Sequence, residues 1–101
     1  MKKNTIRRRQ ISEDCWHLDY SFLKWLQERL PVYLNEAGKI VDLDFHKFTY
    51  KDNEYTQKQM IEKLIVLVND AAKYNLWDDE YLPTVDEILE IWKLIFHSMW
   101  W

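Results

Sequence analysis

Residues 56–74, TQKQMIEKLIVLVNDAAKY, carry the clearest helix pattern in the chain. Thr56 is followed three residues later by Gln59, which matches a capping box in which two side chains satisfy the first free backbone N–H groups of a helix. Behind this start, apolar residues recur at helical spacing: Met60, Ile61, Leu64, Ile65, Leu67, Val68, Ala71 and Ala72. Because so wide an apolar stripe is typical of a helix covered on most sides, we predict a central helix over 57–74.

A second helix is predicted downstream, over residues 85–99. Thr84 and Glu87 match another capping box. Apolar residues again follow at helical spacing: Ile88, Leu89, Ile91, Trp92, Ile95, Phe96 and Met99.

The third predicted helix lies upstream, over about residues 18–36. Ser12-Glu13-Asp14 is one possible start, and Asp19 is another that suits an N-cap, with Trp16 and Leu18 before it as staple residues. Pro31 lies inside the apolar pattern, where it removes a backbone donor and clashes with the carbonyl four residues earlier. We therefore expect a kink near residues 27–31, or two short helices, and a C-terminal cap at Gly38.

Residues 40–56 change from helical to alternating periodicity. The apolar residues Val41, Leu43 and Phe45 alternate with polar neighbours, which predicts a strand. The Asp52–Asn53 pair tolerates the backbone of a two-residue hairpin turn. The segment is therefore a small hairpin or, because isolated hairpins are weak, an irregular loop.

Composition agrees with a helical fold. The chain has 101 residues, the size of one domain, and contains one Gly and two Pro. An all-β domain would need many more turn residues. We predict a mainly α fold with three principal helices (about 18–36 kinked at Pro31, 57–74 and 85–99) and a hairpin or loop at 40–56.

Charge divides the chain into a basic arm, residues 1–11, and a single helical domain, residues 12–101. The first ten residues hold five basic and no acidic side chains, so a net charge of −3 leaves −8 for the remaining 91. We expect the arm to be mobile, or a first turn that orders on a partner. The acidic body is a poor surface for nucleic acid.

Targeting features are few. Cys15 is the only cysteine, so no internal disulfide can form, which fits a reducing compartment. The basic start has no apolar stretch behind it, and no run of about 18 apolar residues occurs. The expected location is the cytoplasm, that of the host cell if a phage encodes the protein, with no membrane as partner.

Two clusters could carry chemistry. Asp42, Asp44 and His46 would share one face of a strand, where they could bind a divalent metal or exchange protons. Cys15 and His17 have the spacing of two zinc ligands, but a zinc site needs two more, and only His46 and His97 remain as nitrogen donors. A solvated strand face and a small core cysteine explain these residues more simply, so we expect no catalytic residue, no metal and no cofactor.

Three segments are candidates for contact with a partner. Trp77, Asp78, Asp79 and Glu80 form an acidic, aromatic loop suited to a basic, partly apolar protein. Trp100 and Trp101 end the chain with two indoles, which fold back on the domain or fill a pocket in a partner or subunit. Arg7, Arg8 and Arg9 could neutralise phosphates of a nucleic acid.

Residues 15–26, CWHLDYSFLKWL, continuing to Arg29-Leu30-Pro31, resemble a segment that recurs in small uncharacterised proteins of tailed bacteriophages. Tyr50-Lys51 and the Glu54–Gln57 segment with its helix are similar to that group as well. Together these matches cover about half the chain. The resemblance implies a phage or prophage accessory protein, and it implies neither a catalytic signature nor a cofactor.

The leading hypothesis is therefore a phage-type accessory protein that binds a host protein directly, such as a nuclease complex of anti-phage defence, and is not an enzyme. Its acidic body could occupy a nucleic-acid channel. Three alternatives stay open: a homo-oligomer that sequesters a nucleotide, a small DNA-binding regulator that uses the arm, and a small hydrolase built on Asp42, Asp44 and His46.

Overall fold

The computed structural model describes residues 2–75 and 77–99, with side chains from Arg7 onward, and these residues form a mainly helical fold as predicted. In chain order the elements are α1 (Lys2–Cys15), α2 (Leu18–Ala37), β1 (Lys47–Tyr50), β2 (Asn53–Thr56), α3 (Gln57–Lys73), α4 (Tyr81–Ile95) and the short 3-10 helix η1 (Phe96–Ser98). The three predicted helices correspond to α2, α3 and α4, and α1 is an additional helix.

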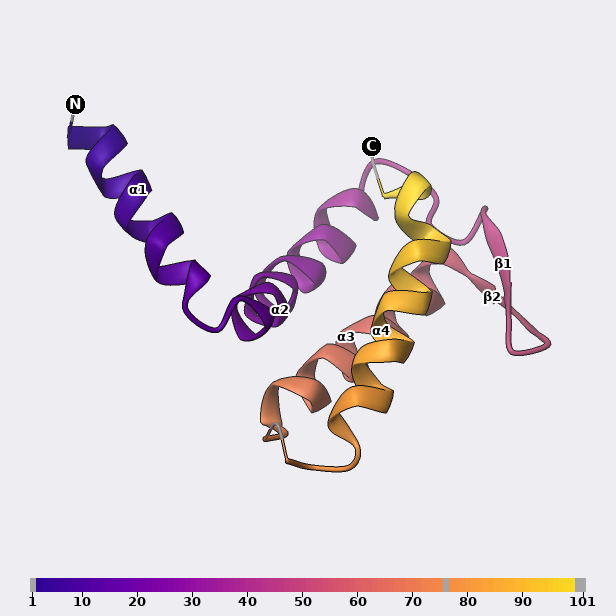
Figure 1. Ribbon diagram of the computed structural model, residues 1–101. Coiled ribbons are helices and arrows are strands. Elements are labelled where there is room, and N and C mark those ends of the chain that lie inside the picture. The colour runs from indigo at the N-terminus through magenta and orange to yellow at the C-terminus, as the bar shows by residue number, and fades with distance from the viewer. Residues whose placement is uncertain (1, 76, 100–101) are drawn as a thin grey trace.

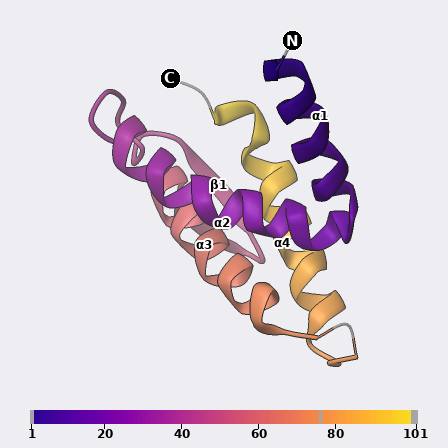
Figure 2. The same cartoon turned by 90° about the vertical axis from the view of Figure 1, so that its left-hand side faces the viewer.

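The core lies where α3 contacts both α2 and α4 (Figures 1 and 2), so the predicted central helix is confirmed. The buried side chains come mainly from these three helices: Leu23, Leu26 and Leu30 of α2, Met60, Ile61, Leu64 and Val68 of α3, and Ile88, Ile91 and Ile95 of α4. Each such residue contributes about 1.5–3 kcal/mol by leaving water. The core is therefore a three-helix layer with the hairpin at its edge.

The predicted capping box at the start of α3 is confirmed. The Thr56 hydroxyl accepts a hydrogen bond from the Gln59 backbone N–H at 3.2 Å, and the Gln59 side-chain oxygen accepts one from the Thr56 N–H at 2.9 Å. The helix runs to Lys73, one residue short of the predicted end.

The predicted start of α4 is wrong by four residues. The helix begins at Tyr81, and the Thr84 N–H already donates to the Glu80 carbonyl at 3.0 Å, so Thr84 is not a cap. Pro83 is tolerated there because the first turn of a helix has no partner for its N–H groups. The helix ends at Ile95 and continues as η1 to Ser98.

α2 passes through Pro31 as one helix, so the alternative of two short helices is wrong. Its N-cap is His17, in the left-handed region at φ 54°, rather than the predicted Asp19, which lies inside the first turn. Gly38 occupies the predicted C-cap position, and its N–H donates to the Leu34 carbonyl at 3.2 Å.

The hairpin is real but shorter than predicted. β1 and β2 pair antiparallel, and the turn consists of Lys51 and Asp52, both at positive φ, one residue earlier than the predicted Asp52–Asn53 turn. Residues 41–46 form turns and bends, so the strand predicted from their alternation is wrong.

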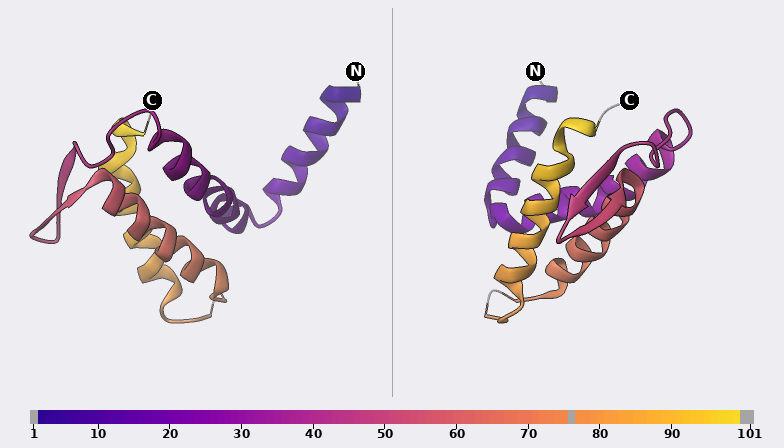
Figure 3. Two further views of the ribbon diagram at one scale, coloured as in Figure 1. Left: turned by 180° about the vertical axis from the view of Figure 1, so that it is seen from behind. Right: turned by 90° about the vertical axis from the view of Figure 1, so that its right-hand side faces the viewer.

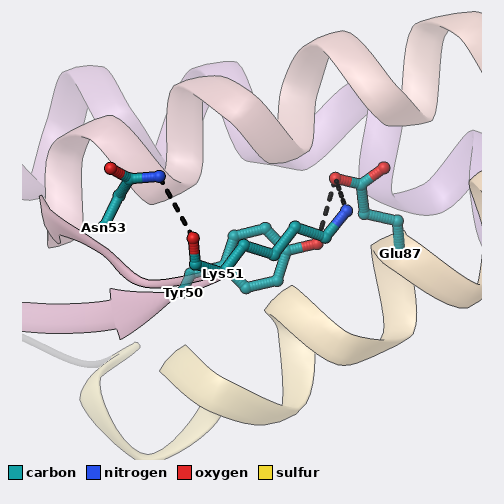
Figure 4. A network of polar contacts seen from close by, with 4 residues as sticks. All are labelled: Tyr50, Lys51, Asn53 and Glu87. Carbon is teal, nitrogen blue, oxygen red and sulfur yellow. Dashed lines mark hydrogen bonds and ion pairs between the residues drawn. The ribbon is translucent and has the colours of Figure 1, made fainter.

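The tip of the hairpin is attached to α4 through Glu87 (Figure 4). The Tyr50 hydroxyl donates to the Glu87 carboxylate at 2.9 Å, and the Lys51 ammonium lies 3.3 Å from the same oxygen. Burial, helped by the neighbouring carboxylate, raises the pKa of Tyr50. These contacts hold the two-stranded sheet against the helical layer, which gives an otherwise weak hairpin its support.

From Lys2 onward the basic arm is helical and forms most of α1. Figure 1 and the left view of Figure 3 show α1 leading away from the three-helix body, and its main contact is with α2. The radius of gyration is 15.6 Å, whereas a compact domain of this length has about 13 Å. The molecule is therefore a compact body with one projecting helix.

Candidate interaction surface

The loop between α3 and α4, predicted to bind a partner, is a tight turn that presents its indole to solvent. The Asp78 carboxylate accepts a hydrogen bond from the Asn75 N–H at 2.9 Å, and the Asp78 N–H donates to the Asn75 carbonyl at 3.0 Å. The Trp77 side chain is 87% exposed, so it does not cover the core. Asp79 and Glu80 are exposed beside it. The loop therefore exposes one indole and two carboxylates.

A hydrogen bond connects this loop to the start of α2. The Tyr81 hydroxyl donates to the Asp19 carboxylate at 2.9 Å. This donation is the main cause that lowers the pKa of Asp19, with a contribution from the Tyr20 N–H. Burial is the main cause that raises the pKa of Tyr81. The acidic loop and the turn between α1 and α2 thus belong to the same end of the molecule.

A cleft of about 380 Å³ lies at that end. One wall is formed by the start of α2 and the other by the end of α3. Its lining residues are His17, Asp19, Tyr20, Leu23, Ala71, Ala72, Lys73, Tyr74, Asn75 and Tyr81. Trp16, next to this cleft in sequence, is exposed. We name Trp16 and His17 the elbow, because they connect α1 to α2.

α2 has a second apolar face that was not predicted from the sequence. Four of its exposed side chains fall on one side of the helix: Leu18, Phe22, Trp25 and Val32. At 100° per residue they span about 80°, and they are centred about 120° away from the buried leucines of the same helix. The Arg29 guanidinium lies over the Trp25 ring, 4.6 Å from its centre. We name these four residues the α2 stripe.

The α2 stripe could have been recognised from spacing. Positions 18, 22, 25 and 32 form a separate helical series from positions 23, 26 and 30. One apolar face is sufficient to predict a helix, so the helix prediction does not separate the second series from the first.

The three consecutive arginines do not form a single basic face. Arg7, Arg8 and Arg9 are exposed on α1, and three successive helical residues are spread over about 200°. Cys15, at the end of the same helix, is exposed, so the interpretation of it as a small core residue is wrong.

Asp42, Asp44 and His46 do not share a strand face. The Asp42 carboxylate accepts a hydrogen bond from the Asp44 N–H at 3.0 Å, and the Asp44 carboxylate accepts one from the Thr56 hydroxyl at 2.9 Å. The His46 ring packs edge-on against Phe45. Among the described residues, no group of three or more His, Cys, Asp and Glu side chains is placed to hold a metal ion.

A larger hollow, of about 600 Å³, lies at the end of α2, where Lys39 and Lys58 line it together with Asp42 and Asp44. Two cations facing two carboxylates give it no net preference for a charged ligand. The predicted contacts Trp100 and Trp101 lie outside the described residues.

No family model, curated protein or solved structure matches this chain. Across residues 2–75 and 77–99, none of the helices combines the length and apolarity needed to cross a bilayer.

Proposed function

We propose that this protein acts by binding another protein through the Trp77–Glu80 loop. The observation that carries this proposal is the Trp77 side chain, 87% exposed among acidic neighbours. An exposed indole on a loop held by its own hydrogen bonds loses little entropy on binding, and Trp is enriched among the residues that dominate binding energy.

The partner that fits this surface is a protein with a basic, partly apolar face. Asp79 and Glu80 supply negative charge beside Trp77, and the chain outside its first ten residues is strongly acidic. Complementary charge speeds encounter and selects the partner, while the Trp77 indole supplies affinity when binding buries it.

The resemblance to tailed-phage proteins supports a host protein as that partner, with the chain as a phage-type accessory protein. A nuclease complex of anti-phage defence has the appropriate chemistry, because a channel that binds nucleic acid is basic. The protein would then inhibit by occupying that channel, which requires no catalysis of its own.

The test compares a loop variant with a charge-matched control. The loop variant combines Trp77→Ala, Asp79→Asn and Glu80→Gln, and it keeps Asp78 because that carboxylate holds the turn through the Asn75 N–H. The control combines Asp52→Asn and Glu62→Gln, two other exposed acids. Both variants lose the same charge, so a difference between them reports on the loop itself.

Each protein is used to capture proteins from host extract, and the affinity of any protein retained by the wild type is then measured by calorimetry. We expect the loop variant to bind at least about tenfold more weakly, since hot-spot residues contribute about 2 kcal/mol or more. The control is expected to bind like the wild type. Equal affinities of all three proteins would exclude this loop as the binding site.

A further inference from the structure

α1 is a helix without enough packing in its own chain. It has 14 residues, and isolated helices of about 12–15 residues are marginal in water. Among the described residues, the buried core contains no side chain from α1. A polar helix that leads away from the body therefore requires another surface to stabilise it.

The charges of this chain make α1 complementary to the rest of the molecule. Lys2–Cys15 carries five basic and two acidic residues, a net +3, which leaves −6 for residues 16–101 out of a total of −3. Because α1 leads away from its own body, the acidic surface it can reach belongs to a second copy of the chain. The basic helix of one copy is therefore attracted to the acidic body of another copy.

The α2 stripe and the elbow supply apolar area for the same contact. Trp16 is 75% exposed, Trp25 48% and Phe22 38%. Covering these three rings would bury on the order of 400 Å² per copy, about half of the roughly 800 Å² that each partner contributes to a standard interface. Leu18 and Val32 extend the patch along the helix.

We propose that this protein forms a two-fold symmetric dimer in which the α2 stripes of two copies pack against each other and each α1 lies against the acidic body of the second copy. A two-fold axis pairs the same patch of both copies, which suits a single apolar stripe. The stripe begins directly after the elbow, so α1 projects from the edge of the pairing surface. This interface is separate from the Trp77–Glu80 loop.

The test of the stripe uses two valines of almost equal exposure. Val32, on the α2 stripe, is 59% exposed, and Val66, on α3, is 58% exposed. Full-length wild type, Val32→Glu and Val66→Glu are compared by sedimentation equilibrium over a hundredfold range of concentration, with circular dichroism to verify folding. We expect a wild-type dimer, a dissociation constant raised at least about tenfold by Val32→Glu, and no change with Val66→Glu.

Reversal of the α1 charges tests the second contact. Replacing Arg7, Arg8 and Arg9 together by Glu is expected to weaken the dimer and to reduce the dependence of dimerisation on salt. An unchanged dimer in this variant would overturn the assignment of α1 to the second copy.

Two other outcomes would overturn the dimer itself. One is a wild-type monomer at every concentration, and the other is equal dissociation of both valine variants. A monomer whose affinity for duplex DNA is lost with the arginine reversal would instead assign α1 to nucleic acid. None of these results bears on partner binding by the Trp77–Glu80 loop, so the two proposals fail separately.

Discussion

At the residue scale, the hydrogen bond from Tyr81 to Asp19 can be tested quantitatively, because it joins the acidic loop to the start of α2 at the proposed binding end. Tyr81→Phe removes the donor. We expect a loss of about 0.5–1 kcal/mol in the free energy of unfolding at neutral pH, less than for a buried charged pair because Asp19 is exposed. Urea denaturation of wild type and variant measures the difference.

The pH dependence of that loss has a definite sign. The folded state lowers the pKa of Asp19 below its ordinary value of 3.8. The stabilisation is therefore present above pH 3.8 and disappears as the pH falls through the lowered pKa. The difference between wild type and Tyr81→Phe should shrink in that acid range. Tyr74→Phe is the control, because the Tyr74 hydroxyl has no hydrogen bond among the described residues. A Tyr81→Phe effect that did not change with pH would contradict this account.

At the element scale, two threonines that look alike in sequence are expected to behave differently. Thr56 caps α3 and also donates to Asp44, whereas Thr84 lies inside α4. Thr56→Ala should lower the free energy of unfolding by about 1–2 kcal/mol. Thr84→Ala should change it by less than about 0.5 kcal/mol, because Ala is the better helix former. Thermal or urea denaturation measures both, and equal losses would mean that α4 begins at Thr84 after all.

The sequence could predict that the three body helices exist, but not where each one begins and ends. Periodicity identified α2, α3 and α4, because each buries one apolar face and that face repeats every 3.6 residues. The ends of each helix and strand depend on local effects, such as side-chain hydrogen bonds and proline geometry, which the spacing of apolar residues does not show. Pro83 fits a first turn. The Asp42 carboxylate closes a turn with the Asp44 N–H, and the Asp44 carboxylate accepts from the Thr56 hydroxyl, so the two do not line a strand.

α1 and the α2 stripe were missed for a related reason. A polar helix has no apolar face to detect, so α1 has no periodic signal. The α2 stripe does have helical spacing, but its residues were counted together with the buried leucines of the same helix. Of the candidate contacts, the exposed Trp77 loop could be named from composition alone, while its proximity to the start of α2 depends on Tyr81 and Asp19, which are far apart in sequence.

At the scale of the whole molecule, the body and α1 have different sources of stability. The body is held by three helices around α3, whereas α1 makes its main contact with α2 near the elbow. The two proposed surfaces match this division: an acidic, aromatic end for a foreign protein and an apolar stripe with a basic helix for a second copy. A two-fold dimer would present two copies of the acidic end, which raises the apparent affinity for a partner with repeated sites.

This division predicts that the body folds without α1. Deleting residues 1–15 should leave the free energy of unfolding of the monomer within about 0.5 kcal/mol of the full chain, because surface changes away from the core have effects of that size. The helical circular dichroism signal should fall by the contribution of the lost helix. Urea denaturation at a concentration where both proteins are monomeric measures the difference. Leu26 is a fully buried residue of α2, so Leu26→Ala, with an expected loss of about 2–5 kcal/mol in the free energy of unfolding, serves as the reference for lost core packing. A loss on deletion that approached the Leu26→Ala value would mean that α1 packs on its own body and is not available to a second copy.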